Sequence, residues 1–85
     1  IVSSNHYNDS SLDIVIMAIT SQIDQTLGMG ECLVADWKIA GLLKPSAIKP
    51  TISTIEQKLI IKKLGKLSSA DLSSVENALR NFLDL

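Results

Sequence analysis

The sequence has little of the chemistry that disulfides, metal sites and nucleophilic triads require. Its 85 residues contain one cysteine, Cys32, and one histidine, His6. An intrachain disulfide therefore cannot form, which fits a reducing compartment, and we expect a cytoplasmic protein. The acidic residues are scattered without the spacing of metal ligands, so we expect neither a metal site nor a cofactor.

Both single residues have simple structural interpretations. A Ser-His-Asp or Cys-His site would have to use His6, which lies near Asn5 and Asn8, where a solvated loop histidine is the simpler interpretation. Cys32 precedes apolar residues and is interpreted as a small buried hydrophobe. The glycines of GMG at 28–30 come without the lysine and the strand–helix context of a phosphate-binding loop.

Long hydrophobic runs are missing as well. No apolar stretch is long enough to span a bilayer and no signal peptide is recognisable, so we expect no membrane partner. The net charge of −1 excludes a uniformly basic nucleic-acid binder but permits local basic patches. With 46% hydrophobic and only 4% aromatic residues, the chain must build its core from aliphatic side chains. Its length predicts a single domain over residues 1–85.

The first half of the chain predicts strands joined by loops. Residues 13–19 (DIVIMAI) form an apolar, β-branched run that is typical of a strand buried on both faces. Residues 1–4 would be the neighbouring strand of a hairpin, with the turn formers of residues 5–11 as its loop. Residues 23–30 are interpreted as a loop, and residues 31–35 alternate as a short strand would.

The middle of the chain predicts a turn and another strand. Residues 36–44 contain Gly41 and stop before Pro45, so they form one helical turn at most. Residues 46–55 alternate, and Pro50 within them removes one ladder donor, which indicates an edge strand or a bulge. The candidates for inward-facing positions in this strand are Ile48, Ile52 and Ile55.

The C-terminal segment predicts an amphipathic helix. Ser68 is a good N-cap, and Asp71, three residues on, can close a capping box, with Leu67 and Leu72 as its hydrophobic staple. Apolar residues then recur at spacings of three and four on one face, which we expect to be buried: Leu72, Val75, Leu79, Phe82 and Leu83. Four or five strands followed by this helix predict a small, barrel-like, mainly β domain with the helix packed on the sheet.

Three hydrogen-bonding side chains, Thr20, Ser21 and Gln22, directly follow the apolar strand. A side chain at the end of a buried strand is held by the sheet yet faces solvent, which suits a reacting group. Hydroxyl and amide groups at this position can donate to a phosphate oxygen or a base edge. The simpler interpretation is that they satisfy backbone groups at the strand end.

A cationic segment follows in residues 58–67 (KLIIKKLGKL). This segment predicts another strand with Gly65 as a bulge, or alternatively a short helix. It holds four of the eight basic residues: Lys58, Lys62, Lys63 and Lys66. They are interpreted as a solvated strand edge, where lysines also block aggregation, and the alternative is a face that binds polyanions.

The segments ITSQ at 19–22, GLLKPS at 41–46 and LGKLSSADL at 64–72 occur in this order. Together they resemble the MazF/PemK family of toxin endoribonucleases from bacterial type II toxin–antitoxin systems, and the resemblance runs over essentially the whole chain. It implies a small SH3-like β-barrel with a C-terminal helix, and a homodimer. It also implies metal-independent, sequence-specific cleavage of single-stranded RNA through the ribose 2′-hydroxyl, a cognate antitoxin that masks the RNA groove, and no DNA binding by the toxin itself.

By the same resemblance, Thr20 is a catalytic residue that stabilises the pentacoordinate phosphorane, while Ser21 and Gln22 bind RNA in the groove. The family pattern also has a glycine-containing hairpin and an Arg-Pro pair ahead of the strand that continues into residues 1–4. That arginine is the principal acid–base residue, whereas the only arginine here is Arg80, on the last helix. We therefore expect the chain to lack the family's N-terminal segment and to be inactive by itself. The alternative is a non-catalytic remnant or binding module that dimerises or binds an antitoxin.

Overall fold

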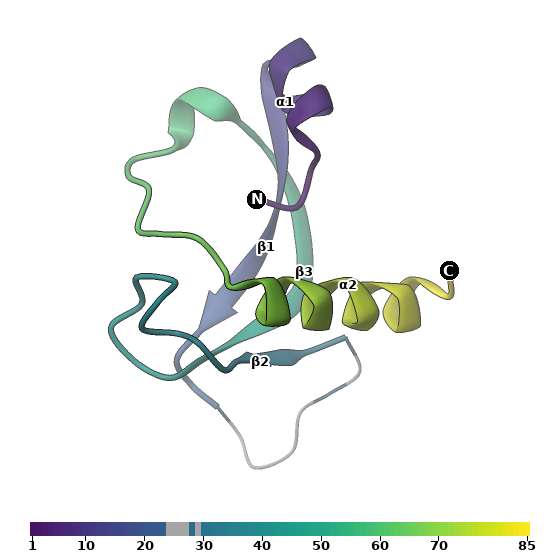
Figure 1. Ribbon diagram of the computed structural model, residues 1–85. Helices are drawn as coiled ribbons and strands as arrows, with labels where there is room; N and C mark the ends of the chain where they lie inside the picture. Colours follow the sequence, from purple (N-terminus) through teal and green to yellow (C-terminus); the bar gives the residue numbers. More distant parts are fainter. Residues whose placement is uncertain (24–27, 29) are drawn as a thin grey trace.

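The computed structural model describes residues 1–23, 28 and 30–85. Its strands form one antiparallel sheet, against which the C-terminal helix packs (Figure 1). The strands are β1 (Asp13–Thr20), β2 (Cys32–Val34) and β3 (Ser46–Glu56), in the spatial order β1-β3-β2. The helices are α1 (Asn5–Ser10), the short 3-10 helix η1 (Gln57–Leu59) and α2 (Ser69–Leu83). The loop predicted at residues 23–30 lies largely outside the described residues.

The central strand β3 changes its partners near Pro50. Its first residues pair with β2 on one side and β1 on the other, whereas the residues after Ile48 pair with β1 alone. The register with β1 shifts here, because Met17 lies opposite Ile52 while the next residue lies opposite Lys49. Proline has no N–H to donate, so it is tolerated where the ladder is already interrupted. The predicted bulge is therefore confirmed.

The core lies between α2 and the end of the sheet where β2 and β3 pair. Helix α2 has 15 residues and β2 only three, so a helix of about 22 Å extends past the sheet at its C-terminal end (Figure 1). Ile48 is buried as expected, but Ile52, on the far side of the bulge, is 40% exposed. The buried residues that pack together there are Val34, Ala40, Ile48 and Val75.

The apolar stripe of α2 is therefore only partly buried. Val75 is 5% exposed, and Leu79 packs against the core as predicted. Leu72, Phe82 and Leu83 are each more than 40% exposed, because the small sheet does not reach them. The spacing correctly predicted the face of the helix but not how much of that face the sheet covers.

The N-terminus of α2 is tied to the segment that follows β2. Ser68 caps the helix, because its Oγ accepts a hydrogen bond from the Asp71 N–H at 3.2 Å. The Asp71 carboxylate accepts from the backbone N–H groups of Ala35 (3.0 Å) and Asp36 (2.9 Å), so it does not complete the predicted reciprocal capping box. Asp71 is 3% exposed. One buried carboxylate thus joins two parts of the fold.

The N-terminal residues differ from the prediction. Residues 5–10, predicted as a loop, form α1, because the Ser4 Oγ caps the helix by accepting from the Tyr7 N–H. Turn-forming residues are also good helix caps, so the same composition suits both structures. Residues 1–4 form no strand, but the Val2 and Ser3 N–H groups donate to the Val15 carbonyl at 2.8 and 3.3 Å. They lie beside β1, where the hairpin partner was predicted.

Apart from Lys58 and Leu59, which belong to η1, residues 58–67 form neither the predicted strand nor the alternative helix. Beyond η1 the chain runs in irregular structure to α2 and crosses the turn at residues 36–44, which itself forms no helix, as predicted. A Cβ added to Gly65 would lie 2.3 Å from the Ala40 carbonyl oxygen, and one added to Gly41 would lie 2.2 Å from the Leu64 carbonyl oxygen. Only glycine permits two backbones to approach this closely.

Replacing Gly65 with alanine is expected to lower the free energy of unfolding by about 1–3 kcal/mol, because the added methyl group overlaps a backbone carbonyl and forces a backbone shift. Gly28→Ala is the matched control, since its Cβ would meet only the Glu31 side chain, at 3.5 Å. Urea denaturation followed by circular dichroism compares the two variants. A Gly65→Ala variant as stable as the unmodified chain would contradict this account of the crossing.

Candidate functional site

Thr20 is held by the sheet at the end of β1. It is the last residue of that strand and lies opposite Ala47 of β3, which in turn lies opposite Leu33 of β2. Three strands therefore meet at this position, and the Thr20 side chain is half-buried. A side chain on such a framework keeps its direction better than one on a free loop.

The Thr20 hydroxyl is fixed on one side and free on the other. Its Oγ1 accepts a hydrogen bond from the backbone N–H of Gln22 at 3.1 Å. Among the hydrogen bonds of the described residues, this hydroxyl donates to no backbone carbonyl, so its proton is available to an incoming acceptor. Ser21 and Gln22 are exposed beside it. The structure thus places the three predicted site residues together, with a hydroxyl donor at the centre.

The start of β3 lies beside the Thr20 end of β1. Lys44 precedes this strand, and the Ser46 Oγ donates to the Lys44 carbonyl at 2.9 Å, which fixes the entry of the chain into β3. Ala47 follows directly and pairs with Thr20. The sequence could not reveal that the start of β3 lies beside Thr20, because this depends on the register between two strands.

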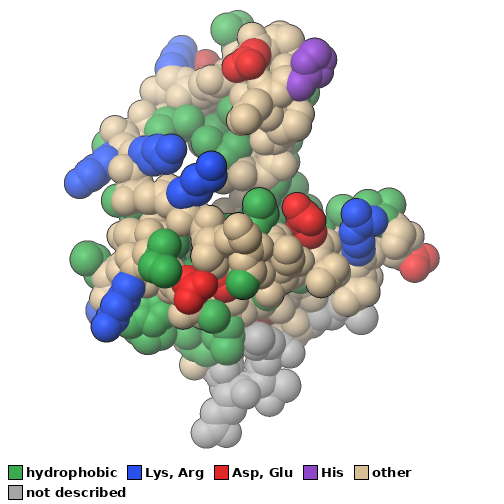
Figure 2. Space-filling model, in the orientation of Figure 1, with side chains coloured by type: hydrophobic (Ala, Val, Ile, Leu, Met, Phe, Trp, Pro, Cys, Tyr) green, Lys and Arg blue, Asp and Glu red, His purple; other side chains and the backbone are tan. Residues whose placement is uncertain are grey.

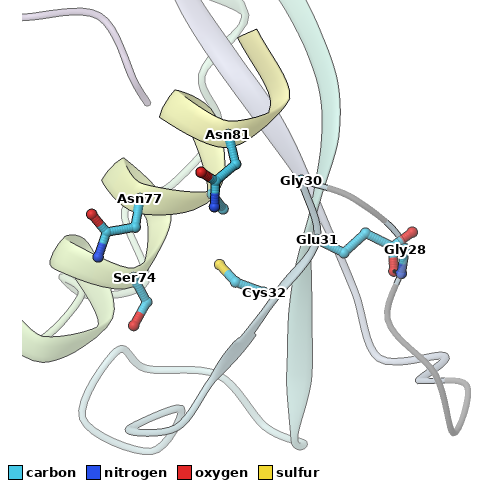
Figure 3. A pocket seen from close by; sticks show the side chains of 8 residues that line it. Gly28, Gly30, Glu31, Cys32, Ser74, Asn77 and Asn81 are labelled. Carbon is cyan, nitrogen blue, oxygen red and sulfur yellow. Dashed lines mark hydrogen bonds between the residues drawn. The ribbon is translucent and has the colours of Figure 1, made fainter. Parts of the chain in front are cut away.

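A second candidate is a shallow hollow of about 790 Å³ between β2 and α2. Cys32 lines it from β2, while Ser74, Asn77 and Asn81 line it from α2 (Figure 3). From the sequence, Asn77 and Asn81 are expected to lie away from the apolar stripe of this helix, and their spacing of three and four residues from Ser74 onward was the signal for a polar row that was not interpreted as a site. The hollow is open and holds no charged residue from α2, so it has weaker means of binding a ligand than the Thr20 end.

Cys32 is half-buried beside this hollow and packs against the core. Burial raises the pKa of its thiol above the ordinary value, and the negative charge of Asp71 raises this pKa further. The thiol therefore stays protonated at neutral pH and is a poor nucleophile. Cys32, predicted as a small buried hydrophobe, thus packs against the core but is only partly buried.

Alkylation of Cys32 by iodoacetamide at pH 8 is expected to be at least about tenfold slower than alkylation of a free thiol. The unfolded thiol ionises first as the pH rises through its pKa of about 8.5, so the free energy of unfolding should fall above that pH. Mass spectrometry of timed samples, with a urea-unfolded control, measures the rate. A folded chain that reacts as fast as the unfolded control would contradict a raised pKa.

Two other kinds of site receive no support from the described part of the chain. Within it, no three His, Cys, Asp or Glu side chains lie close enough to hold a metal ion. Across residues 1–23, 28 and 30–85, no helix combines the length and apolarity needed to cross a bilayer. The end of β1 remains the arrangement with the clearest chemical potential.

Comparison with known proteins identifies the fold and the family. The family model of the PemK-like, MazF-like toxin of type II toxin–antitoxin systems matches residues 1–83. The chain belongs to the PemK/MazF toxin family. It matches no curated protein. The Mycobacterium tuberculosis toxin MazF-mt6 is similar in structure, with a TM-score of 0.84 and 20% sequence identity over 100% of this chain and 83% of that one.

The PemK/MazF fold predicted from the sequence is thus confirmed. At 20% identity, the likeness to MazF-mt6 shows a shared fold, namely an antiparallel sheet with a C-terminal helix. Within the described residues this sheet has three strands and is not closed into a barrel. Membership of the family makes the chain a toxin-type domain of a type II toxin–antitoxin system.

Proposed function

We propose that this chain is the toxin of a type II toxin–antitoxin system and that its chemistry is metal-independent cleavage of single-stranded mRNA in the cytoplasm. Family membership over residues 1–83 supports the toxin role. The proposed cleavage reaction is supported by the Thr20 hydroxyl, whose oxygen is held by the Gln22 N–H and whose proton is available to a phosphate. A cognate antitoxin would cover the RNA groove, and two copies of the chain would form a homodimer.

Thr20 would act on the phosphate at the cleaved bond. When the ribose O2′ attacks phosphorus and the O5′ leaves, negative charge develops on the non-bridging oxygens of a pentacoordinate intermediate. A preorganised hydroxyl donor stabilises such charge without moving, because the sheet and the Gln22 N–H already hold its oxygen in place. The exposed Ser21 and Gln22 side chains would contact the neighbouring RNA.

The 85 residues alone are proposed to show little or no cleavage of RNA. Cleavage also needs a strong cation at the phosphate, and the only arginine, Arg80, lies in the last turn of α2. Figure 1 shows this end of α2 on the opposite side of the molecule from the end of β1. Arg80 therefore cannot act together with Thr20 within one chain.

The test is cleavage of a single-stranded RNA library in the presence of EDTA. It uses a longer form that carries an Arg-Pro segment before Ile1, with the 85-residue chain in parallel. We expect cuts at a short recurring sequence, products ending in a 2′,3′-cyclic phosphate, and no cleavage where a 2′-deoxy nucleotide precedes the bond. Failure of the longer form to cut any RNA, with retained antitoxin binding, would instead favour a non-catalytic binding module.

A further inference from the structure

Basic side chains are concentrated on one face of the molecule. Figure 2 shows them gathered where residues 58–67 and the turn at residues 36–44 run. We call this surface the basic face and define it by five exposed lysines out of eight basic residues: Lys44, Lys58, Lys62, Lys63 and Lys66. Such a concentration is notable in a chain whose net charge is −1.

The glycine crossing makes the basic face continuous. Gly41 lies against the Leu64 carbonyl, and Gly65 lies against the Ala40 carbonyl, so the two segments that carry these lysines touch each other. Lys44 follows Gly41 closely in the sequence, and Lys66 directly follows Gly65. Lysines from distant parts of the sequence therefore share one surface.

This surface begins at the Thr20 end of the sheet. Lys44 lies three residues before Ala47, which pairs with Thr20. The Ser46 Oγ donates a hydrogen bond to the Lys44 carbonyl and so fixes the backbone between them. From there the basic face continues along residues 62–66 toward η1 (Figure 1). A strand of RNA with its cleaved bond at Thr20 could follow it in one direction.

The two acidic residues that flank residues 58–67 do not neutralise the lysines of this segment. Glu56 pairs with Lys58 at 3.2 Å, and both side chains are well exposed, so the pair is weak. Asp71 is buried and accepts from the Ala35 and Asp36 amides. The other lysines of the basic face form no ion pair with the described residues, so their charge remains available to an anionic ligand.

We propose that the basic face binds the phosphates of single-stranded RNA beside the bond held at Thr20. This inference rests on the proposed function and adds to it the surface that holds the substrate. Ile61 is 98% exposed and Leu64 is 60% exposed among the lysines. Such apolar side chains can contact the faces of unpaired bases, which a duplex does not present.

The test measures binding of a fluorescent 2′-O-methyl single-stranded RNA by anisotropy between 50 and 300 mM KCl. This RNA has no free 2′-hydroxyl and cannot be cleaved, so the result is independent of catalysis. The variant is Lys62→Gln/Lys63→Gln. The matched control is Lys49→Gln/Arg80→Gln, which removes the same charge from two exposed residues outside the basic face.

Losing two phosphate contacts should reduce the slope of log Kobs against log[KCl] by about 1.4 and weaken binding about tenfold at 100 mM KCl. The control should bind within about twofold of the unmodified chain, and circular dichroism should show all three folded. Equal weakening in both variants, or no RNA binding by the unmodified chain, would overturn the inference. So would a lysine variant that keeps its RNA affinity and loses only affinity for a polyglutamate peptide.

Discussion

Replacing Thr20 with alanine is expected to slow RNA cleavage by about 10²–10³-fold, the usual effect of removing one transition-state hydrogen-bond donor. The longer form that carries an Arg-Pro segment before Ile1 provides the measurable rate. The reason is geometric, since the Gln22 N–H holds the Thr20 oxygen and leaves its proton for the phosphate. Single-turnover cleavage of a labelled RNA, with EDTA present, measures the loss.

Thr20→Ser is the matched control, because it keeps the hydroxyl and should retain activity within about tenfold. The free energy of unfolding should change by about 1 kcal/mol at most in either variant, since only one hydrogen bond at a strand end is affected. The 85-residue chain should show little cleavage with or without the substitution. An unchanged rate for Thr20→Ala in the longer form would mean that Thr20 only satisfies backbone groups at the end of β1 and takes no part in cleavage.

Replacing Asp71 with alanine is expected to lower the free energy of unfolding by about 3–6 kcal/mol. The buried carboxylate accepts from the Ala35 and Asp36 amides, and hydrogen bonds to a charged group contribute about 1.5–3 kcal/mol each. Small domains have a total free energy of unfolding of only about 5–15 kcal/mol, so the substitution would remove a large part of it. Urea titration followed by circular dichroism measures the change.

Two comparisons make this stability prediction specific. Asp71→Asn keeps one carbonyl oxygen but turns an amide N–H₂ toward the other backbone donor, so it should lose about half as much stability. Glu76→Ala removes an exposed acid from the same helix and should change stability by no more than about 0.5 kcal/mol. If Asp71→Ala and Glu76→Ala prove equally stable, the carboxylate is not an essential link between α2 and the sheet.

Elements with a strong local pattern were predicted well from the sequence. The β-branched run of β1, the alternation of β3 and the capped periodicity of α2 each contain their own signal. Residues 58–67 were wrongly predicted as a strand because they are rich in Ile and Leu, while their course is set by the crossing at Gly41 and Gly65. Local spacing does not encode a contact between two distant backbones.

The candidate site, too, was only partly predictable from the sequence. Thr20, Ser21 and Gln22 could be found because they are consecutive and follow a recognisable strand. That the start of β3 lies beside them could not be found, because it depends on the pairing of Ala47 with Thr20. The partners of Asp71 lie 35 and 36 residues away, so its capping position was predictable and its second role was not.

The long sequence separation between Asp71 and its backbone partners affects the order in which the molecule folds and locally unfolds. The link from Asp71 to Ala35 and Asp36 closes a loop that contains all of β3, and closing it costs chain entropy that local contacts must first offset. We expect the β2–β3 pairing, in which Val34 lies opposite Ser46 and the chain between them is short, to form before α2 docks. In native-state hydrogen exchange, the Ala35 and Asp36 amides would then open together with the undocking of α2 and before the sheet, which makes them reporters for the attachment of a single helix.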